Sequence, residues 1–258
     1  MNAEIVPLAA ESLGKDDSHA VVLLHPICAN RDIWRLQLPV WSKSFRLVLV
    51  DLPGHGFSKP LGGTPTLTDF ARQLAVTLTR AGVDQASLVG VSLGAMLAQA
   101  FALEFPERIR KLVLANAGAV TPEPVVALWN ERQRSYREFG AEQHVRSTIE
   151  RWFDDDYRAR APLTVKWIES LVRATTQAGY FEAVDAIKGM NHVARLQEIS
   201  VPTLVVAGEK DAAVKPEICA KVAEAITGAR SVVLPSGHIS NVEAAAEFTE
   251  VVGQFLLS

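Results

Sequence analysis

A serine between two glycines is the residue of this chain best suited to covalent chemistry. It is Ser92, within residues 90–94, which read Gly-Val-Ser-Leu-Gly. An apolar, β-favouring run, residues 86–91, leads into it, and a helical segment of small residues, 93–100, follows. A strand, a sharp turn and a helix in this order hold such a serine in a strained conformation, with its hydroxyl exposed at the end of a sheet. The pattern therefore predicts a nucleophilic serine.

The serine needs two partners, because its hydroxyl is a weak nucleophile near neutral pH without a base and an acid that orients the base. Where this turn occurs, the acid and then the histidine base follow the serine along the chain. Asp211 comes just after an apolar run, residues 202–208, and His238 just after the last such run, 230–234. We therefore predict a catalytic triad of Ser92, Asp211 and His238 at one edge of a sheet.

Other residues near the same strand ends could compete for these roles. Glu209 is close to Asp211, but it would point away from a site that Asp211 faces. His25 and His55 also follow strands, and we interpret them as histidines that shape loops near the site. No neighbouring residue in the sequence would lower the thiol pKa of Cys28, so we predict a small apolar filler rather than a second nucleophile.

An acyl-transfer site also needs hydrogen-bond donors for the oxyanion. One predicted donor is the backbone N–H of Leu93, which follows the serine at the start of a helix. The second donor should come from the loop after the strand at residues 20–24. Pro26 has no N–H, so Ile27 is the predicted donor and Cys28 is the alternative.

Composition limits the class of protein. The chain has 258 residues, of which 48% are hydrophobic and 21% charged, and its formal net charge is −3. Such a chain is expected to be globular, and it has no basic excess that would attract nucleic acid. No apolar run reaches the ~18 residues needed to cross a bilayer, and residues 1–4 do not resemble the start of a signal peptide. Cys28 and Cys219 suggest neither a disulfide framework nor a metal site. We therefore expect a cytoplasmic protein without membrane association or a bound metal, and the oligomeric state stays open.

Strands and helices alternate along most of the chain, which predicts a mostly parallel, twisted sheet with helices on both faces. From residue 119 to 195 the pattern is helical, and all three tyrosines and three of the five tryptophans lie there. We predict an α/β core domain, residues 1–118 and 196–258, with a helical cap, residues 119–195, inserted into it. The predicted strands are residues 4–8, 20–24, 45–51, 86–91, 109–115, 202–208 and 230–234.

These motifs resemble the α/β-hydrolase family over nearly the whole chain, and the loop at residues 51–58 is similar to the one that follows the second core strand in that family. The cap and the C-terminal third more narrowly resemble the 3-oxoadipate enol-lactonases. This narrower resemblance is carried by Trp129, Arg132, and residues 149–153, 179–180, 186–187 and 237–243. It implies an α/β-hydrolase fold and hydrolysis of a small carboxylate-bearing lactone through a serine acyl-enzyme, with no cofactor. Ser92, Asp211 and His238 match the triad motifs of the family.

A carboxylate on the substrate would need a cation, and Arg132 in the predicted cap is our candidate. Trp129 and Trp152, with Trp167, are expected to line the pocket. The expected partner is a small ester or lactone, whose acyl and leaving groups the sequence does not specify. The alternatives are a general carboxylesterase, a carbon–carbon bond hydrolase with the same triad and, as a non-enzyme, a ligand receptor on the hydrolase fold.

Overall fold

Seven strands form one sheet in the computed structural model, which describes residues 5–258. The strands are β1 (Ala10–Gly14), β2 (Ala20–Leu24), β3 (Arg46–Val50), β4 (Ala86–Val91), β5 (Ile109–Ala115), β6 (Thr203–Gly208) and β7 (Arg230–Leu234). They lie in the order β1-β3-β2-β4-β5-β6-β7. Strand β1 runs antiparallel to β3, and all the other neighbours are parallel. This mostly parallel sheet confirms the predicted fold class.

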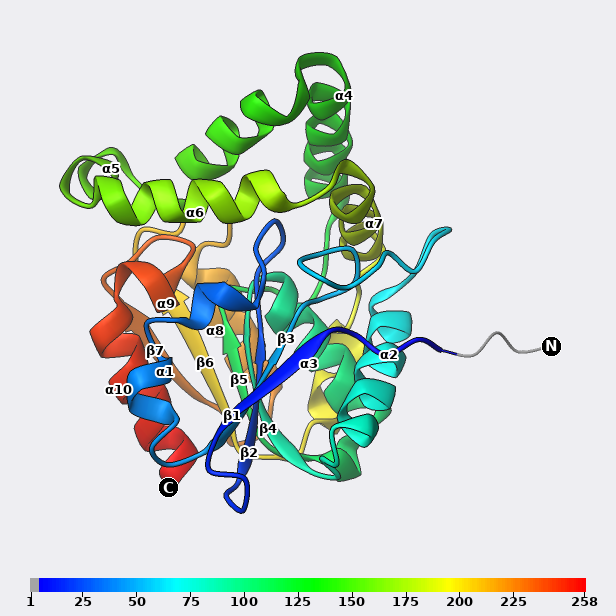
Figure 1. Cartoon of the computed structure of the whole chain (residues 1–258), viewed down its shortest axis with the longest axis vertical. Helices are drawn as coiled ribbons and strands as arrows, with labels where there is room; N and C mark the ends of the chain where they lie inside the picture. The colour runs from blue at the N-terminus through cyan, green and yellow to red at the C-terminus, as the bar shows by residue number, and fades with distance from the viewer. Residues whose placement is uncertain (1–4) are drawn as a thin grey trace.

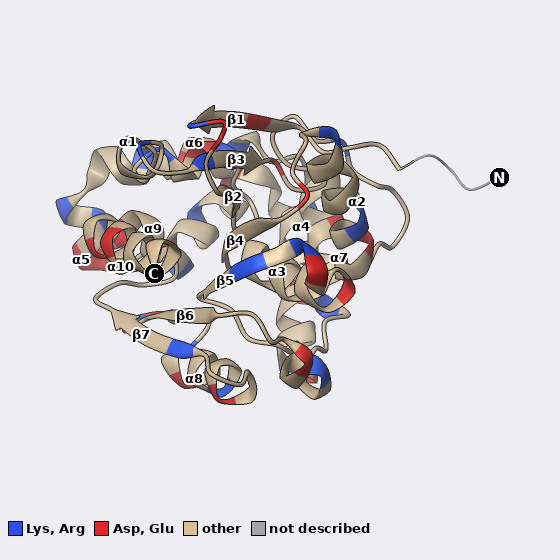
Figure 2. Ribbon diagram, turned by 90° about the horizontal axis from the view of Figure 1, so that it is seen from below, with Lys and Arg blue, Asp and Glu red and all other residues tan. Residues whose placement is uncertain are grey.

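Helices cover both faces of the sheet. They are α1 (Leu38–Trp41), α2 (Leu67–Arg80), α3 (Leu93–Glu104), α8 (Pro216–Ala225) and α10 (Ala245–Leu257). Helices α2, α3 and α8 lie on one face, and α1 and α10 lie on the other (Figure 2). Every residue of the central strands β2 and β4 is consequently buried. Burial on both faces explains why these strands are continuous apolar runs rather than alternating ones.

The strand order reverses beside β4. The chain first adds β3 on one side of β2 and then returns to place β4 on the other side. In open parallel sheets, the crevice at the carboxyl ends of the strands at such a point is the usual ligand site. Ser92 follows β4 directly, so the fold places the predicted nucleophile at this crevice.

Four further helices lie over the carboxyl ends of the strands (Figure 1). They are α4 (Glu123–Trp152), α5 (Asp155–Arg160), α6 (Pro162–Ala174) and α7 (Gln177–Lys188), and we call them the helical layer. Gly140, with a φ of +77°, breaks α4 into two helical limbs, residues 123–139 and 141–152. The layer falls within the segment predicted to be a cap, whose domain boundaries at 119 and 195 stay a prediction.

The helical layer is attached to the core through backbone contacts. Gly179 in α7 lies directly against Gly54, which has a φ of +73°, and a Cβ on either glycine would collide with the other backbone. The buried carboxylate of Glu182 accepts hydrogen bonds from the N–H groups of Leu61 and Gly62, both at 2.8 Å. These contacts hold α7 against the loop that precedes α2.

The structure corrects the predicted first strand, residues 4–8. Residue 4 lies outside the described residues, residues 5–8 are not a strand, and the first strand is instead β1. Strand β1 is an edge strand with mostly exposed side chains, so it lacks the apolar signal that marks the buried strands. The remaining short helices are η1 (Arg31–Trp34), η2 (Pro106–Arg108), η3 (Val193–Glu198) and α9 (Ser240–Glu243).

Within residues 5–258, none of the helices combines the length and the apolar character that crossing a bilayer would require.

Candidate active site

Ser92 occupies a strained turn between β4 and α3. Its φ of +53° and ψ of −115° lie in a region that non-glycine residues rarely adopt. The turn is fixed on the sheet side, where the N–H of Ser92 donates to the carbonyl of Ala115 at 2.8 Å. It also depends on Gly90 and Gly94, because a Cβ at Gly90 would meet the backbone of α3 and one at Gly94 would meet the end of β2. The hydroxyl consequently projects from the end of β4.

The structure brings Ser92, His238 and Asp211 into one chain of hydrogen bonds. The distance from His238 Nε2 to Ser92 Oγ is 2.9 Å, and from His238 Nδ1 to Asp211 Oδ2 it is 2.8 Å. All three residues are buried, with 3–6% of their surface exposed. An ionised carboxylate can only accept, so Nδ1 carries the proton and Nε2 is left to accept the hydroxyl proton of Ser92. This is the geometry that a serine nucleophile and its base require.

The carboxylate of Asp211 has four donors. Oδ2 accepts from His238 and from Asn116 Nδ2 at 3.1 Å, and Oδ1 accepts from the N–H groups of Ala213 and Val214 at 2.8 and 2.9 Å. Burial alone would raise the pKa of Asp211, but its electrostatic interaction with His238 and these hydrogen bonds outweigh burial and hold the pKa below its usual value. The acid therefore stays ionised at neutral pH.

Asn116 is a functional residue that the sequence analysis missed. It follows β5 with a φ of +53°, and its amide donates to Asp211 while its Oδ1 accepts from Ser240 Oγ at 2.6 Å. The sequence signal that could have pointed to Asn116 is an asparagine directly after a strand, because Asn tolerates this left-handed conformation better than most residues.

The competing residues take the places expected of them. Glu209 is exposed. His25 Nε2 accepts from the N–H of Leu52 at 2.9 Å, and His55 Nε2 accepts from the N–H of Cys28 at 3.1 Å. The Nδ1 atom of each ring faces a proline carbonyl at 2.8 Å, so both rings are neutral with the proton on Nδ1. Burial lowers both pKa values, that of His55 to about 4. These two histidines shape the loops beside the site.

The hydrogen bond from Cys28 to His55 distinguishes Ile27 from Cys28, the two candidates for the second oxyanion donor. The N–H of Cys28 is engaged by His55, so it is not free for a ligand. Among residues 5–258, no protein acceptor takes the N–H of Ile27. Ile27 borders the same cavity as Ser92. Leu93 is the first residue of α3, so its N–H has no partner within that helix. Ile27 and Leu93 therefore remain the proposed pair.

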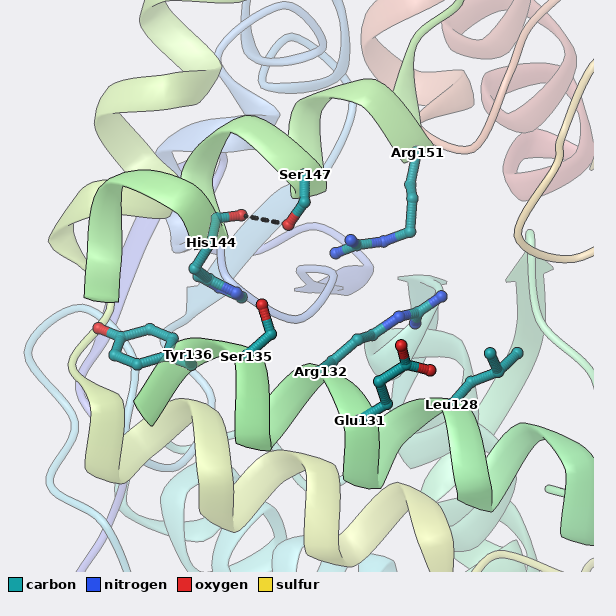
Figure 3. A pocket seen from close by; sticks show the side chains of 8 residues that line it. All are labelled: Leu128, Glu131, Arg132, Ser135, Tyr136, His144, Ser147 and Arg151. Carbon is teal, nitrogen blue, oxygen red and sulfur yellow. Dashed lines mark hydrogen bonds between the residues drawn. The ribbon is translucent and has the colours of Figure 1, made fainter. Parts of the chain in front are cut away.

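A cavity of about 200 Å³, which we call the inner cavity, lies beside Ser92 and His238. Trp129, Arg132 and Trp152 line it, as the sequence analysis expected. Trp167 does not, because it packs elsewhere with the guanidinium of Arg35 4.4 Å from its ring. The cavity is also lined by Cys28, Thr148, Arg151 and Tyr180. Arg132 and Arg151 extend toward each other from the two limbs of α4 (Figure 3).

The thiol of Cys28 is part of the wall rather than a second nucleophile. Burial raises the pKa of Cys28 to about 12, so the thiolate does not form near neutral pH. Its sulfur lies 3.3 Å from His144 Nε2, and burial lowers the pKa of His144 to about 4.

The described residues contain no group of three or more His, Cys, Asp or Glu side chains placed to hold a metal ion.

Comparison with known proteins identifies the family. The sequence profile described as the alpha/beta hydrolase fold matches residues 19–245. The chain belongs to the α/β-hydrolase family. This finding confirms the family predicted from the sequence, and the protein is an enzyme of that family.

Enol-lactonases are among the similar proteins. The chain is 26% identical to 3-oxoadipate enol-lactonase 2 of Acinetobacter baylyi, over 98% of this chain and 94% of that protein. The crystal structure of the enol-lactonase from Burkholderia xenovorans superposes with a TM-score of 0.93 at 29% identity, covering 97% of this chain and 96% of the other. The crystal structure of a hydrolase from Pseudomonas aeruginosa also gives a TM-score of 0.93, at 31% identity and with coverage of 97% and 94%.

Proposed function

We propose that this protein is a serine hydrolase that cleaves a small carboxylic ester or lactone through an acyl-enzyme. The observation that carries the proposal is the hydrogen-bonded chain from Ser92 Oγ through His238 to Asp211, with links of 2.9 and 2.8 Å. A nucleophile, its base and an orienting acid are already in contact at the wall of a small cavity, so no rearrangement of these groups is needed before the reaction.

The reaction begins when His238 Nε2 takes the hydroxyl proton and Ser92 Oγ attacks the carbonyl carbon. The N–H groups of Leu93 and Ile27 stabilise the negative charge that develops on the carbonyl oxygen. The protonated His238 then donates its proton to the departing oxygen, which leaves an ester on Ser92. His238 next deprotonates a water molecule, and the resulting hydroxide releases the acid and restores the serine. Throughout, Asp211 fixes the tautomer of the imidazole and offsets its charge.

A lactone is the preferred substrate class within this proposal. Support comes from the two enol-lactonases described above and from Trp129, Arg132 and Trp152, which line the inner cavity. In a lactone the departing oxygen stays tethered to the acyl group, and the enol released from an enol lactone converts to a ketone. That conversion makes ring opening effectively irreversible. We also propose residues 119–195 as the cap that covers the reacting atoms and excludes water from them.

Steady-state kinetics on paired lactones and linear esters tests the reaction, with Ser92→Ala as the key variant. We expect Ser92→Ala to lower kcat by about 10⁴-fold or more, because the nucleophile is removed. Ser170→Ala is the matched control, since Ser170 is exposed on α6, and it should retain wild-type rates.

Hydrolysis that survives in Ser92→Ala would contradict the mechanism. Binding of such compounds without turnover by the wild type would point to a ligand receptor instead. Turnover confined to β-diketone compounds would indicate a carbon–carbon bond hydrolase.

A further inference from the structure

A row of buried hydroxyl and amide groups continues the hydrogen bonds of the triad beyond Asp211. Ser236 Oγ donates to Ser240 Oγ at 3.0 Å, and Ser240 Oγ donates to Asn116 Oδ1 at 2.6 Å. Asn116 Nδ2 in turn donates to Asp211 Oδ2 at 3.1 Å. Ser236, Ser240 and Asn116 are completely buried, and we call them the polar row.

All the donors of the polar row point toward Asp211. Ser240 has a single hydroxyl proton, which it gives to the carbonyl oxygen of Asn116, and a lone pair, which accepts the proton of Ser236. Hydrogen bonds aligned in this way polarise one another, so the row strengthens the donor at its end, the Asn116 amide. The ionised carboxylate of Asp211 receives that donor.

The hydroxyl of Ser240 fixes which way the Asn116 amide faces. If the amide turned by 180°, its carbonyl oxygen would lie against the Asp211 carboxylate, and two acceptors would meet without a proton between them. The Ser240 proton opposes this rotation because it is bonded to Oδ1. Without that hydroxyl, the buried Oδ1 of Asn116 would lose its donor, which is costly.

The polar row also connects the loop of the acid with the loop of the base. Ser236 and Ser240 flank His238 between the end of β7 and the start of α9. The carbonyl of Gly237, the residue before His238, accepts from Asn116 Nδ2 at 3.4 Å. The amide held by Ser240 therefore contacts both the Asp211 carboxylate and the backbone beside His238.

We propose that Ser240 is a positioning residue for the hydrolysis, and that it acts through Asn116 on the pair of Asp211 and His238. Ser240 is not among the residues that line the inner cavity, so it affects the reaction through its neighbours rather than through the substrate. Ser236 supports it by supplying the second hydrogen bond of its hydroxyl. This inference rests on the hydrolase function proposed above.

Ser240→Ala tests the role by removing only the hydroxyl. We expect kcat to fall by about 3- to 10-fold while KM changes little, because the loss acts on the reacting groups and not on substrate binding. The proton NMR signal of His238 Nδ1–H should also shift, because the carboxylate that accepts this proton is held differently. Ser236→Ala, one step further from Asp211, should lower kcat by a smaller factor.

The matched control is Ser87→Ala. Ser87 is also completely buried and hydrogen-bonded, with its Oγ 2.8 Å from His19 Nε2, but it lies near the start of β4, at the opposite end of the strand from Ser92. This variant should keep the wild-type kcat and the wild-type position of the His238 signal. Wild-type kcat in Ser240→Ala, or a fall that Ser87→Ala matches, would overturn the proposal.

The same substitution in an Asn116→Gly background tests whether Ser240 acts through Asn116. Once the amide is gone, Ser240 has nothing to orient, so Ser240→Ala should cause no further loss of kcat. Equal losses in the wild-type and Asn116→Gly backgrounds would show that Ser240 acts independently of Asn116 and would contradict the proposal.

Ser92→Ala separates failure of the positioning role from failure of the reaction. Serine-dependent hydrolysis that Ser240→Ala leaves unchanged refutes the role of Ser240 alone. Hydrolysis that persists in Ser92→Ala refutes the proposed reaction, and the role assigned to Ser240 in it falls as well.

Discussion

The two functional regions of the inner cavity differ in how completely the protein satisfies their polar groups. Around Ser92, the imidazole is bonded on both sides and the Asp211 carboxylate accepts four hydrogen bonds. Around Arg132, the guanidinium rests on an aromatic ring and the nearby Tyr180 hydroxyl has no partner within residues 5–258. The reacting groups are thus preorganised without substrate, whereas the recognition groups are incomplete until a ligand binds.

After Ser92→Ala, the largest effect expected from disturbing the reacting region is that of Asp211→Asn. Asparagine keeps the shape of the side chain but removes the charge that fixes the imidazole tautomer. We expect kcat to fall by about 10³- to 10⁴-fold while KM changes little. Kinetics on a neutral ester measures this effect without involving the arginines. A loss below tenfold would show that Asp211 does not orient His238.

Acid should lower the stability of the folded protein, because a buried neutral histidine lies beside each of the two regions. Burial lowers the pKa values of His55 and His144 to about 4, from an unfolded value of 6.5. Between these two pH values the unfolded chain binds more protons than the folded one, so stability declines as pH falls. Each histidine should contribute a loss of up to about 1.4 kcal/mol per pH unit in that window.

Urea unfolding at pH 7 and pH 5 measures this decline in the free energy of unfolding. His144→Gln should make the decline shallower, because one of the buried rings with a lowered pKa is removed. If the stability of wild type and variant depended on pH in the same way, the lowered pKa of His144 would be contradicted.

Asn116→Gly should have the smallest effect of this set. Glycine accepts the positive φ of residue 116, so the substitution removes the donor to Asp211 without straining the backbone. The remaining donors still hold the carboxylate, and we expect kcat to fall by about tenfold. The pH dependence of kcat should also shift as Asp211 loses a hydrogen bond. Unchanged rates across the pH range would show that Asn116 does not position the acid.

The sequence predicted the reacting region better than the recognition region, for a physical reason. Strands β2 and β4 were bounded correctly because buried parallel strands are continuous apolar runs. Ser92, Asp211 and His238 come directly after or near the ends of strands, so the sheet alone determines that they meet. Strand β1 was misplaced because an exposed edge strand carries no such run.

Recognition depends instead on how helices face one another. Arg151 lines the same cavity as Arg132 because Gly140 breaks α4 into two limbs, and Tyr180 reaches that cavity from α7. Helical periodicity gives the face of each segment but not the partner of that face. The role of Asn116 was missed for a related reason, since it depends on a single left-handed residue rather than on a repeating pattern.

The central claim is that Ser92 is the residue that becomes acylated, and covalent labelling tests it most directly. Incubation with a fluorophosphonate, followed by intact-mass measurement and peptide mapping, should show one adduct per chain, located on Ser92, together with loss of hydrolysis. Ser92→Ala should acquire no adduct under the same conditions. An adduct on another residue that abolishes hydrolysis, or full hydrolysis after Ser92 has been labelled, would contradict the account.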